Sequence, residues 1–127
     1  MYSATVLDHF ARPRNVGVLE DASAVGHGGI PGRGNYLVLY LRIERARISE
    51  ARFQTYGCPA AIASGSILTE LVTGRTVAEV GAFEEEYLTE KLGGLPLGRE
   101  HCAQLAVTAL RAALEQWEQN ERGEEEL

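Results

Sequence analysis

Two cysteines and one histidine have the types and the settings to form a reactive or metal-binding site. Cys58 lies between Gly57 and Pro59, and Cys102 directly follows His101. Thiolate sulfur and imidazole nitrogen are ligands that Zn²⁺ and iron–sulfur clusters take. Each cysteine is predicted to lie at the start of a helix, where the positive end of the helix dipole favours the thiolate. If these segments converge, two thiols and an imidazole meet.

The alternative interpretation is that both thiols only fill space. Free cysteine is among the most buried residue types, and the two cysteines here do not form a CxxC pair. Taken one at a time, either is more often a buried filler than a ligand. The first residues lack the pattern of a signal peptide, so we expect a cytoplasmic location and reduced thiols. His9 and His27 are interpreted as a helix-surface and a loop histidine with structural roles.

A glycine-rich segment is the third place where the sequence suggests a site. Residues 26–35 read GHGGIPGRGN, with five glycines and one proline. Such a composition predicts a loop that turns sharply or approaches another group closely. Sites are often built on loops and element ends that a rigid scaffold holds in place. Arg33 and Asn35 near its end are therefore candidates for the same site as the thiols.

The elements that must position these residues predict one small α+β domain. We expect helices at 3–12, 59–72, 84–92 and 101–119, a short helix capped by Thr76 and Glu79, and strands at 22–25, 36–43 and 48–56. The first helix is predicted to present Val6, Leu7 and Phe10 on an apolar side. The strand at 36–43 is nearly all apolar, so we expect both of its faces to be covered. A short connection at 44–47 predicts an antiparallel hairpin in a sheet of about three strands, with helices to one side or end.

The composition fits an ordinary globular protein and places most of the charge at one end. The chain has 127 residues, 45% hydrophobic and 24% charged, with a formal net charge of −6. Residues 115–127 carry six Glu and one Arg, so we divide the chain into a domain at 1–114 and an acidic helix end and tail at 115–127. That tail is interpreted as a solvated helix end, or alternatively as an acidic docking segment. No basic stripe or long apolar run occurs, so neither nucleic acid nor membrane is an expected partner.

Short segments in a fixed order carry a resemblance to a known family. They are YS at 2–3, VLDH at 6–9, PRNVG at 13–17, RFQTYGC at 52–58, AIASGS at 61–66, TE at 69–70, GRT at 74–76, LP at 95–96 and HC at 101–102. From residue 2 to about 113 the chain resembles the NifU N-terminal/IscU family of iron–sulfur cluster assembly scaffolds. The resemblance implies a compact antiparallel sheet packed with helices, in agreement with the fold predicted above.

The resemblance also implies a role and a set of ligands. Members of this family are not enzymes in the usual sense: they accept sulfur from a cysteine desulfurase, gather iron, build a [2Fe–2S] cluster and pass it to apo-proteins. Their site has three cysteines, an aspartate two residues after the first, and a histidine before the third. By this resemblance Cys58 matches the second cysteine, and His101 and Cys102 match the last pair.

At the remaining two positions the sequence departs from the family. Arg33 stands where the first cysteine is expected, and Asn35 stands where the aspartate is expected. Two anionic ligands are therefore replaced by a permanent cation and a neutral amide. Three ligands remain where a closed tetrahedral site takes four, so the site holds a weakly bound Zn²⁺ or [2Fe–2S] cluster completed by water or Asn35, or no metal. Alternatively, Arg33 pairs with Cys58 or Cys102 and holds it as a thiolate.

Three hypotheses follow for the function. The first is a scaffold for iron–sulfur assembly with a weakened iron- or zinc-binding site at Cys58, His101 and Cys102. The second is a sulfur acceptor that carries a persulfide, on Cys102 before Cys58, because His101 can take the proton of its neighbour. The third is a non-catalytic regulator that binds the assembly machinery.

The same resemblance suggests a place for partner docking. The family recruits a chaperone through a Leu-Pro-Pro-Val-Lys motif. The corresponding residues here are Leu95, Pro96, Leu97, Gly98 and Arg99, so the motif is only partly kept. Leu95, Pro96 and Arg99 are the candidate docking residues.

Overall fold

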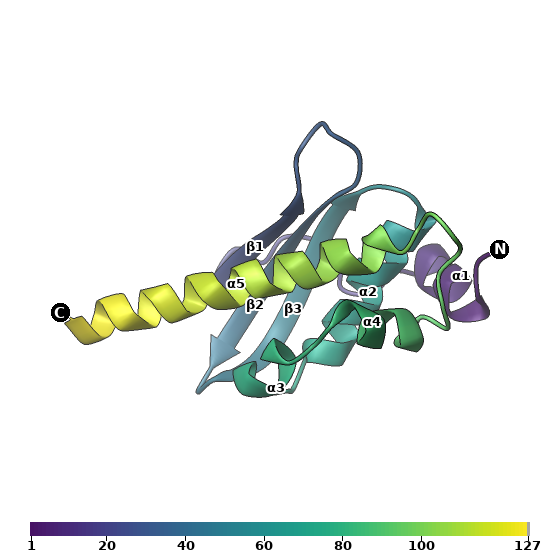
Figure 1. Cartoon of the computed structure of the whole chain (residues 1–127). Coiled ribbons are helices and arrows are strands. Elements are labelled where there is room, and N and C mark those ends of the chain that lie inside the picture. Colours follow the sequence, from purple (N-terminus) through teal and green to yellow (C-terminus); the bar gives the residue numbers. More distant parts are fainter. Residues whose placement is uncertain (127) are drawn as a thin grey trace.

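Three antiparallel strands and the helices that pack against them make up the fold (Figure 1). The computed structural model describes residues 1–126, in the order α1 (Ala4–Ala11), β1 (Ala24–Gly29), β2 (Tyr36–Glu44), β3 (Arg47–Tyr56), α2 (Pro59–Val72), α3 (Val77–Gly81), α4 (Glu85–Lys91) and α5 (His101–Glu126). The strands pair in the order β1–β2–β3, both pairs antiparallel. The predicted α+β class and the predicted hairpin are confirmed.

The core lies between one face of the sheet and helices α2 and α5. Leu37, Leu39 and Leu41 of β2 alternate onto this face, and Phe53 of β3 pairs with Leu39 and is 1% exposed. The opposite face carries the half-buried Tyr40 and charged or polar neighbours. Val38 on that face is 8% exposed, so the expectation that β2 is covered on both faces holds only for part of the strand. Tyr36, Tyr40 and Arg42 are half-buried there, because tyrosine tolerates a partly solvated face.

Strand β1 is longer than the sequence predicts, and its glycines explain the difference. The expected strand at 22–25 instead spans Ala24–Gly29, so only residues 30–35 form the loop. A Cβ atom on Gly26 would lie 2.0 Å from the Ala109 carbonyl oxygen, and one on Gly28 would lie 2.2 Å from that of Leu105. These glycines let the α5 backbone approach the strand closely, so they mark helix–sheet packing and not a turn.

Helix α1 presents a different side to the core than predicted. Ser3 caps it as expected, since its Oγ accepts the Val6 N–H at 3.1 Å. Val6 and His9 are buried, whereas Leu7 and Phe10 are 50% and 42% exposed. The predictions of an apolar side with Leu7 and Phe10 and of a surface His9 are both wrong. The imidazole can be buried because α2 offers it polar partners.

The two helices after the sheet begin as the sequence predicts. Pro59 takes the first position of α2, with Cys58 as its N-cap. Thr76 and Glu79 form the predicted capping box of α3. A Cβ atom on Gly65 would lie 2.4 Å from the Phe53 ring, so α2 packs closely on the sheet, as its small residues predict.

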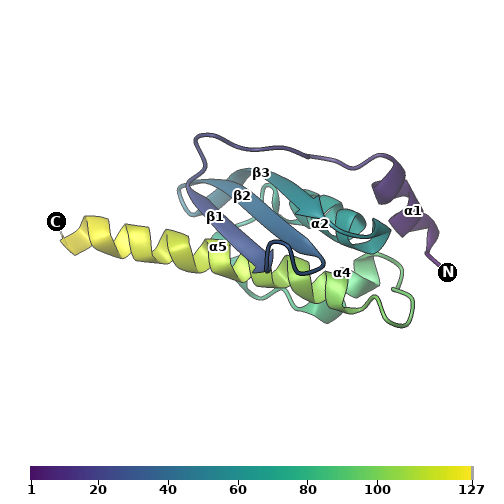
Figure 2. The same cartoon turned by 90° about the horizontal axis from the view of Figure 1, so that it is seen from above.

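Helix α5 runs diagonally across the sheet and continues beyond it (Figures 1 and 2). The sequence predicts its end at about Gln119, but the helix extends to Glu126, since residues 118–122 include good helix formers and no proline. Of the predicted tail at 115–127, Leu127 lies outside the described residues. Within residues 1–126, no helix has the length and apolarity needed to span a membrane.

Candidate functional site

The three segments singled out in the sequence meet at one end of the sheet (Figure 1). Asn35 directly precedes β2, Cys58 lies at the corner between β3 and α2, and His101 and Cys102 open α5. Tyr36 pairs with Tyr56 at the ends of the two strands, which sets Asn35 beside the Cys58 corner. Helix α5 lies along the glycines of β1, so its first turn reaches the same place.

The thiol of Cys102 lies close both to the thiol of Cys58 and to the imidazole of His101. The Sγ atoms of Cys58 and Cys102 are 3.6 Å apart, and Cys102 Sγ lies 3.8 Å from His101 Nε2. His101 is exposed, Cys58 is half-buried and Cys102 is buried. The structure thus brings together all three residues that the sequence proposed as metal ligands.

Asn35 connects all three of these groups. Its Nδ2 lies 3.1 Å from His101 Nε2, 3.5 Å from Cys102 Sγ and 3.8 Å from Cys58 Sγ. Its Oδ1 accepts the backbone N–H of Cys58 at 3.3 Å. The amide oxygen is therefore engaged by the backbone, and the nitrogen, which cannot act as a ligand, faces the candidate ligands.

The environment of Cys58 favours its thiolate. Burial alone would raise the pKa of Cys58, but the backbone N–H of Ala61, the thiol of Cys102, the N–H of Ala60 and the charge of Arg99 lower the pKa below its usual 9.0. The N–H groups of Ala60 and Ala61 belong to the first turn of α2, which begins directly after Cys58. The direction of this shift agrees with the predicted effect of the helix start on Cys58.

Cys102 has the opposite character. Its side chain is 0% exposed, and burial, together with the hydrogen bond and the charge of Cys58, raises the pKa of Cys102 to about 12. The expectation that the helix start makes Cys102 a thiolate is therefore wrong, because desolvation outweighs the dipole. Because the pKa of Cys102 is raised and that of Cys58 is lowered, we expect Cys102 to be the donor and Cys58 the acceptor of their hydrogen bond.

The positive charge at the site comes from an arginine that the sequence assigned to docking. Arg33 is exposed in the 30–35 loop, and within residues 1–126 no ion pair or side-chain hydrogen bond joins it to either thiol. Arg99, just before α5, lowers the pKa of both cysteines by its charge. Its position two residues before His101 was the signal that sequence reasoning did not use.

The other candidate docking residues border the site. Leu95 packs against the small buried cluster of Ala60, Ala61 and Cys102, so part of its side chain belongs to the core. Pro96 is half-buried, Arg99 is exposed, and Leu97 between them is 97% exposed. This segment therefore sits on the rim of the thiol site, with Leu97 as its most accessible apolar side chain.

The residues present do not by themselves make a complete metal site. A closed zinc site and a [2Fe–2S] cluster each take four ligands, and this place offers two sulfurs and one nitrogen. Among residues 1–126, no three His, Cys, Asp or Glu side chains are arranged to hold a metal ion as they stand. The fourth position faces the amide NH₂ of Asn35 instead of a ligand atom.

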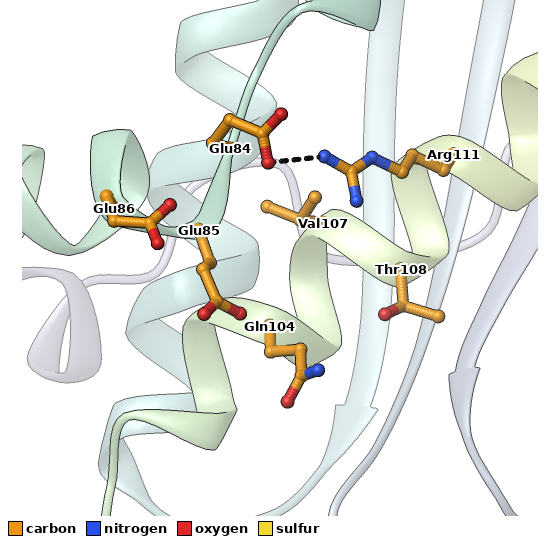
Figure 3. Close-up of a pocket in the computed structure, with 7 residues that line it drawn as sticks. All are labelled: Glu84, Glu85, Glu86, Gln104, Val107, Thr108 and Arg111. Carbon is orange, nitrogen blue, oxygen red and sulfur yellow. Dashed lines mark hydrogen bonds and ion pairs between the residues drawn. The ribbon is translucent and has the colours of Figure 1, made fainter.

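A separate cavity of about 170 Å³ lies between α4 and α5 (Figure 3). Glu84, Glu85 and Glu86 line one side of it, and Arg111 pairs with Glu84 at 2.8 Å. It contains no thiol or imidazole, and its one cation is already neutralised. The chemistry of this chain is therefore expected at the thiols and not in this cavity.

Comparison with known proteins decides the family. The sequence profile of the NifU-like N terminal domain matches residues 1–124. The chain belongs to this family. It is 46% identical over 114 residues to iron-sulfur cluster assembly scaffold protein IscU 1 of Archaeoglobus fulgidus, covering 90% of this chain and 74% of that one. It is also 42% identical over 117 residues to the IscU scaffold protein of Haemophilus influenzae, covering 89% and 92%. The predicted family is confirmed.

Solved structures confirm the fold of this NifU-like domain. The N-terminal domain of a NifU-like protein from Brucella abortus superposes with a TM-score of 0.72, covering 92% of this chain and 94% of that one at 20% identity. At that identity the likeness concerns the fold alone. The roles of Cys58, His101 and Cys102 in this NifU-like domain therefore follow from the contacts that these residues make.

Proposed function

We propose that this protein is a scaffold-type component of iron–sulfur cluster assembly, acting without catalysing a reaction of its own. The observation that carries the proposal is the place of Cys102 Sγ, 3.6 Å from Cys58 Sγ and 3.8 Å from His101 Nε2, at the end of the sheet in a chain of this family. Iron and sulfur are the cargo of such a site. Thiolate and imidazole are the donors that hold iron.

The incomplete ligand set shapes the proposal. Three donors leave one position of a [2Fe–2S] cluster open, so a cluster held here needs a fourth ligand from a partner chain or a small thiol. The expected partners are a cysteine desulfurase that supplies sulfur and apo-proteins that receive the cluster, in the cytoplasm. The exposed segment around Leu97 at the rim is where such partners would approach.

Reconstitution tests this function. The reduced protein is incubated anaerobically with Fe²⁺, cysteine and a cysteine desulfurase, with and without added glutathione. We expect visible absorbance and bound iron that both increase with the added thiol and are lost in Cys58→Ser. Bound iron and absorbance that remain at background under every condition would refute the scaffold proposal.

A second candidate function is that of a persulfide acceptor, and exposure favours Cys58 for this role. Cys58 is half-buried, whereas Cys102 is 0% exposed. In this step the Cys58 thiolate attacks the outer sulfur of the desulfurase persulfide. A new S–S bond forms on Cys58, the old one breaks, and the desulfurase cysteine leaves as a thiolate. We therefore place the persulfide on Cys58, in the reverse of the order that the sequence suggested.

Mass spectrometry of intact protein tests the acceptor role. After incubation with desulfurase and cysteine, we expect the mass of one added sulfur atom, removable by a reductant. The adduct should disappear in Cys58→Ser and persist in Cys102→Ser. An adduct that is lost only in Cys102→Ser would assign the role to the buried thiol instead.

A further inference from the structure

The amide of Asn35 lies next to the three candidate metal-ligand atoms of the site. Its Nδ2 is 3.1–3.8 Å from His101 Nε2, Cys102 Sγ and Cys58 Sγ, while a bound zinc ion would lie about 2.0–2.3 Å from each. The NH₂ group has two protons, and it can donate them to the same lone pairs that a metal ion would take. The amide and a metal ion therefore compete for one place.

The orientation of this amide is fixed by its surroundings. Oδ1 accepts the Cys58 backbone N–H at 3.3 Å, so the NH₂ group must face the donors. Gly57 makes room for it, since a Cβ atom there would lie 2.6 Å from Oδ1 and 3.1 Å from Cγ of Asn35. Asn35 itself directly precedes β2, whose first residue pairs with the last residue of β3. The amide is thus held by one backbone hydrogen bond, in the room that Gly57 leaves.

We propose that Asn35 is a positioning residue that keeps the Cys58–His101–Cys102 site free of metal until its side chain is displaced. An NH₂ group donates hydrogen bonds and has no lone pair to offer. It can therefore donate to the sulfur and nitrogen atoms of the site, but it cannot act as a metal ligand itself. A metal ion must break these hydrogen bonds before it binds. The proposal rests on the site of the proposed function, but it concerns metal affinity and not cluster assembly.

Zinc affinity measures the competition directly. Zn²⁺ is titrated into reduced protein in competition with a chromophoric chelator, for the wild type and for Asn35→Ala, which removes the NH₂ group and adds no ligand. The hydrogen bonds of Asn35 stabilise the metal-free site. Because Asn35→Ala removes them, we expect this variant to bind zinc about tenfold more tightly or better. Equal affinities in the two proteins would overturn the proposal.

Two further variants show whether the gain in zinc affinity arises at this site. Gln54→Ala removes an amide from the outer face of β3, where Gln54 accepts a hydrogen bond from Tyr40, and should leave the zinc affinity unchanged. Asn35→Ala combined with Cys58→Ser should lose the gain. A gain in Gln54→Ala, or one that survives without the Cys58 thiol, would contradict the assignment to this site.

A measurement on the wild type avoids any dependence on how the variants fold. The sequence has three asparagines, Asn15, Asn35 and Asn120, so selective ¹⁵N labelling gives three side-chain NH₂ signals. Saturation with Zn²⁺ should shift the Asn35 signal and leave that of Asn120, in the far part of α5, in place. An Asn35 signal that does not move on zinc binding would overturn the proposal, whatever the outcome of iron–sulfur reconstitution.

Discussion

At the scale of single residues, the two cysteines differ because one is reached by water and the other is not. Both lie at helix starts, yet the pKa of Cys58 is lowered and burial raises the pKa of Cys102 to about 12. The Sγ atoms are 3.6 Å apart, so a protonated Cys102 can donate to Cys58 Sγ. We therefore expect Cys58 to be the nucleophile of the pair and Cys102 its hydrogen-bond donor.

Alkylation should distinguish the two thiols. With iodoacetamide at pH 8 we expect Cys58 to react at least about tenfold faster than Cys102, because only thiolate reacts and only Cys58 is accessible. The rate at Cys58 should rise with pH through a midpoint below its usual 9.0. Peptide mapping by mass spectrometry gives both rates. In Cys102→Ser the hydroxyl can still donate, so the rate at Cys58 should change little, whereas preferential labelling of Cys102 would contradict the assignment.

A second residue-scale feature is His9, which is 5% exposed between α1 and α2. Its Nδ1 lies 2.7 Å from Ser66 Oγ, and its Nε2 lies 3.5 Å from Glu70. Burial and the charge of Arg14 lower the pKa of His9, against the opposing charges of Glu70 and Asp8. The folded protein therefore prefers this imidazole neutral.

This preference makes folding stability depend on pH. Below the usual pKa of 6.5 the unfolded chain binds a proton at His9 that the folded chain resists, so the unfolding free energy should fall as pH falls from 7.5 to 5.5. Urea unfolding at several pH values measures this. In His9→Gln the slope across that window should be smaller. An equal slope in both proteins would show that other groups cause the dependence.

At the scale of elements, close backbone contact positions the thiol site. Gly28 of β1 lies directly under α5, where a Cβ atom would come within 2.2 Å of the Leu105 carbonyl oxygen. The same helix carries His101 and Cys102 one turn earlier. The glycines of β1 therefore determine how closely α5 packs on the sheet, and this distance determines the position of Cys102.

Gly28→Ala should separate α5 from β1. We expect the unfolding free energy to fall by about 1–3 kcal/mol, because the added methyl meets backbone that cannot move aside. Gly123→Ala is the matched control, since Gly123 lies in the exposed part of the same helix with nothing within 4 Å of an added Cβ. It should be neutral or slightly stabilising. Chemical denaturation of both variants tests this, and a loss in the control alone would refute the packing argument.

At the scale of the whole molecule, the acidic end of α5 extends past the folded body (Figure 2). Before it does so, Gln116 accepts the Val25 backbone N–H at 2.7 Å, and Trp117 packs on the core. These two contacts lie beyond residue 114, where the sequence placed the end of the domain. Residues 118–123 are exposed. The structured unit is therefore expected to need Trp117 but not the residues after 119.

Truncation tests this boundary. A chain of residues 1–119 should unfold at the same denaturant concentration as the full chain, because residues 120–123 are exposed. A chain of residues 1–114 should lose about 2 kcal/mol, from the Gln116 hydrogen bond and part of the Trp117 burial. Equal stability of the two truncated chains would place the boundary at 114 after all.

The sequence by itself determined the order of the elements, the antiparallel hairpin, the caps at Ser3 and Thr76 and the three segments of the site. Local signals carry all of these, since capping, turn chemistry and alternation depend on neighbouring residues. It misplaced the end of β1 and the burial of His9, because both depend on which distant backbone or side chain comes close.

Only the tertiary structure decided how the site is arranged. The sequence showed that Asn35 and Arg33 replace expected ligands. It did not show that the Asn35 amide faces all three ligand atoms, or that Arg99 supplies the charge that lowers the pKa of Cys58. The sequence likewise could not show that the pKa values of the two cysteines, each at a helix start, shift in opposite directions. Desolvation depends on everything packed around a sulfur, and that packing is settled only when α2, α5 and the loop before β2 meet.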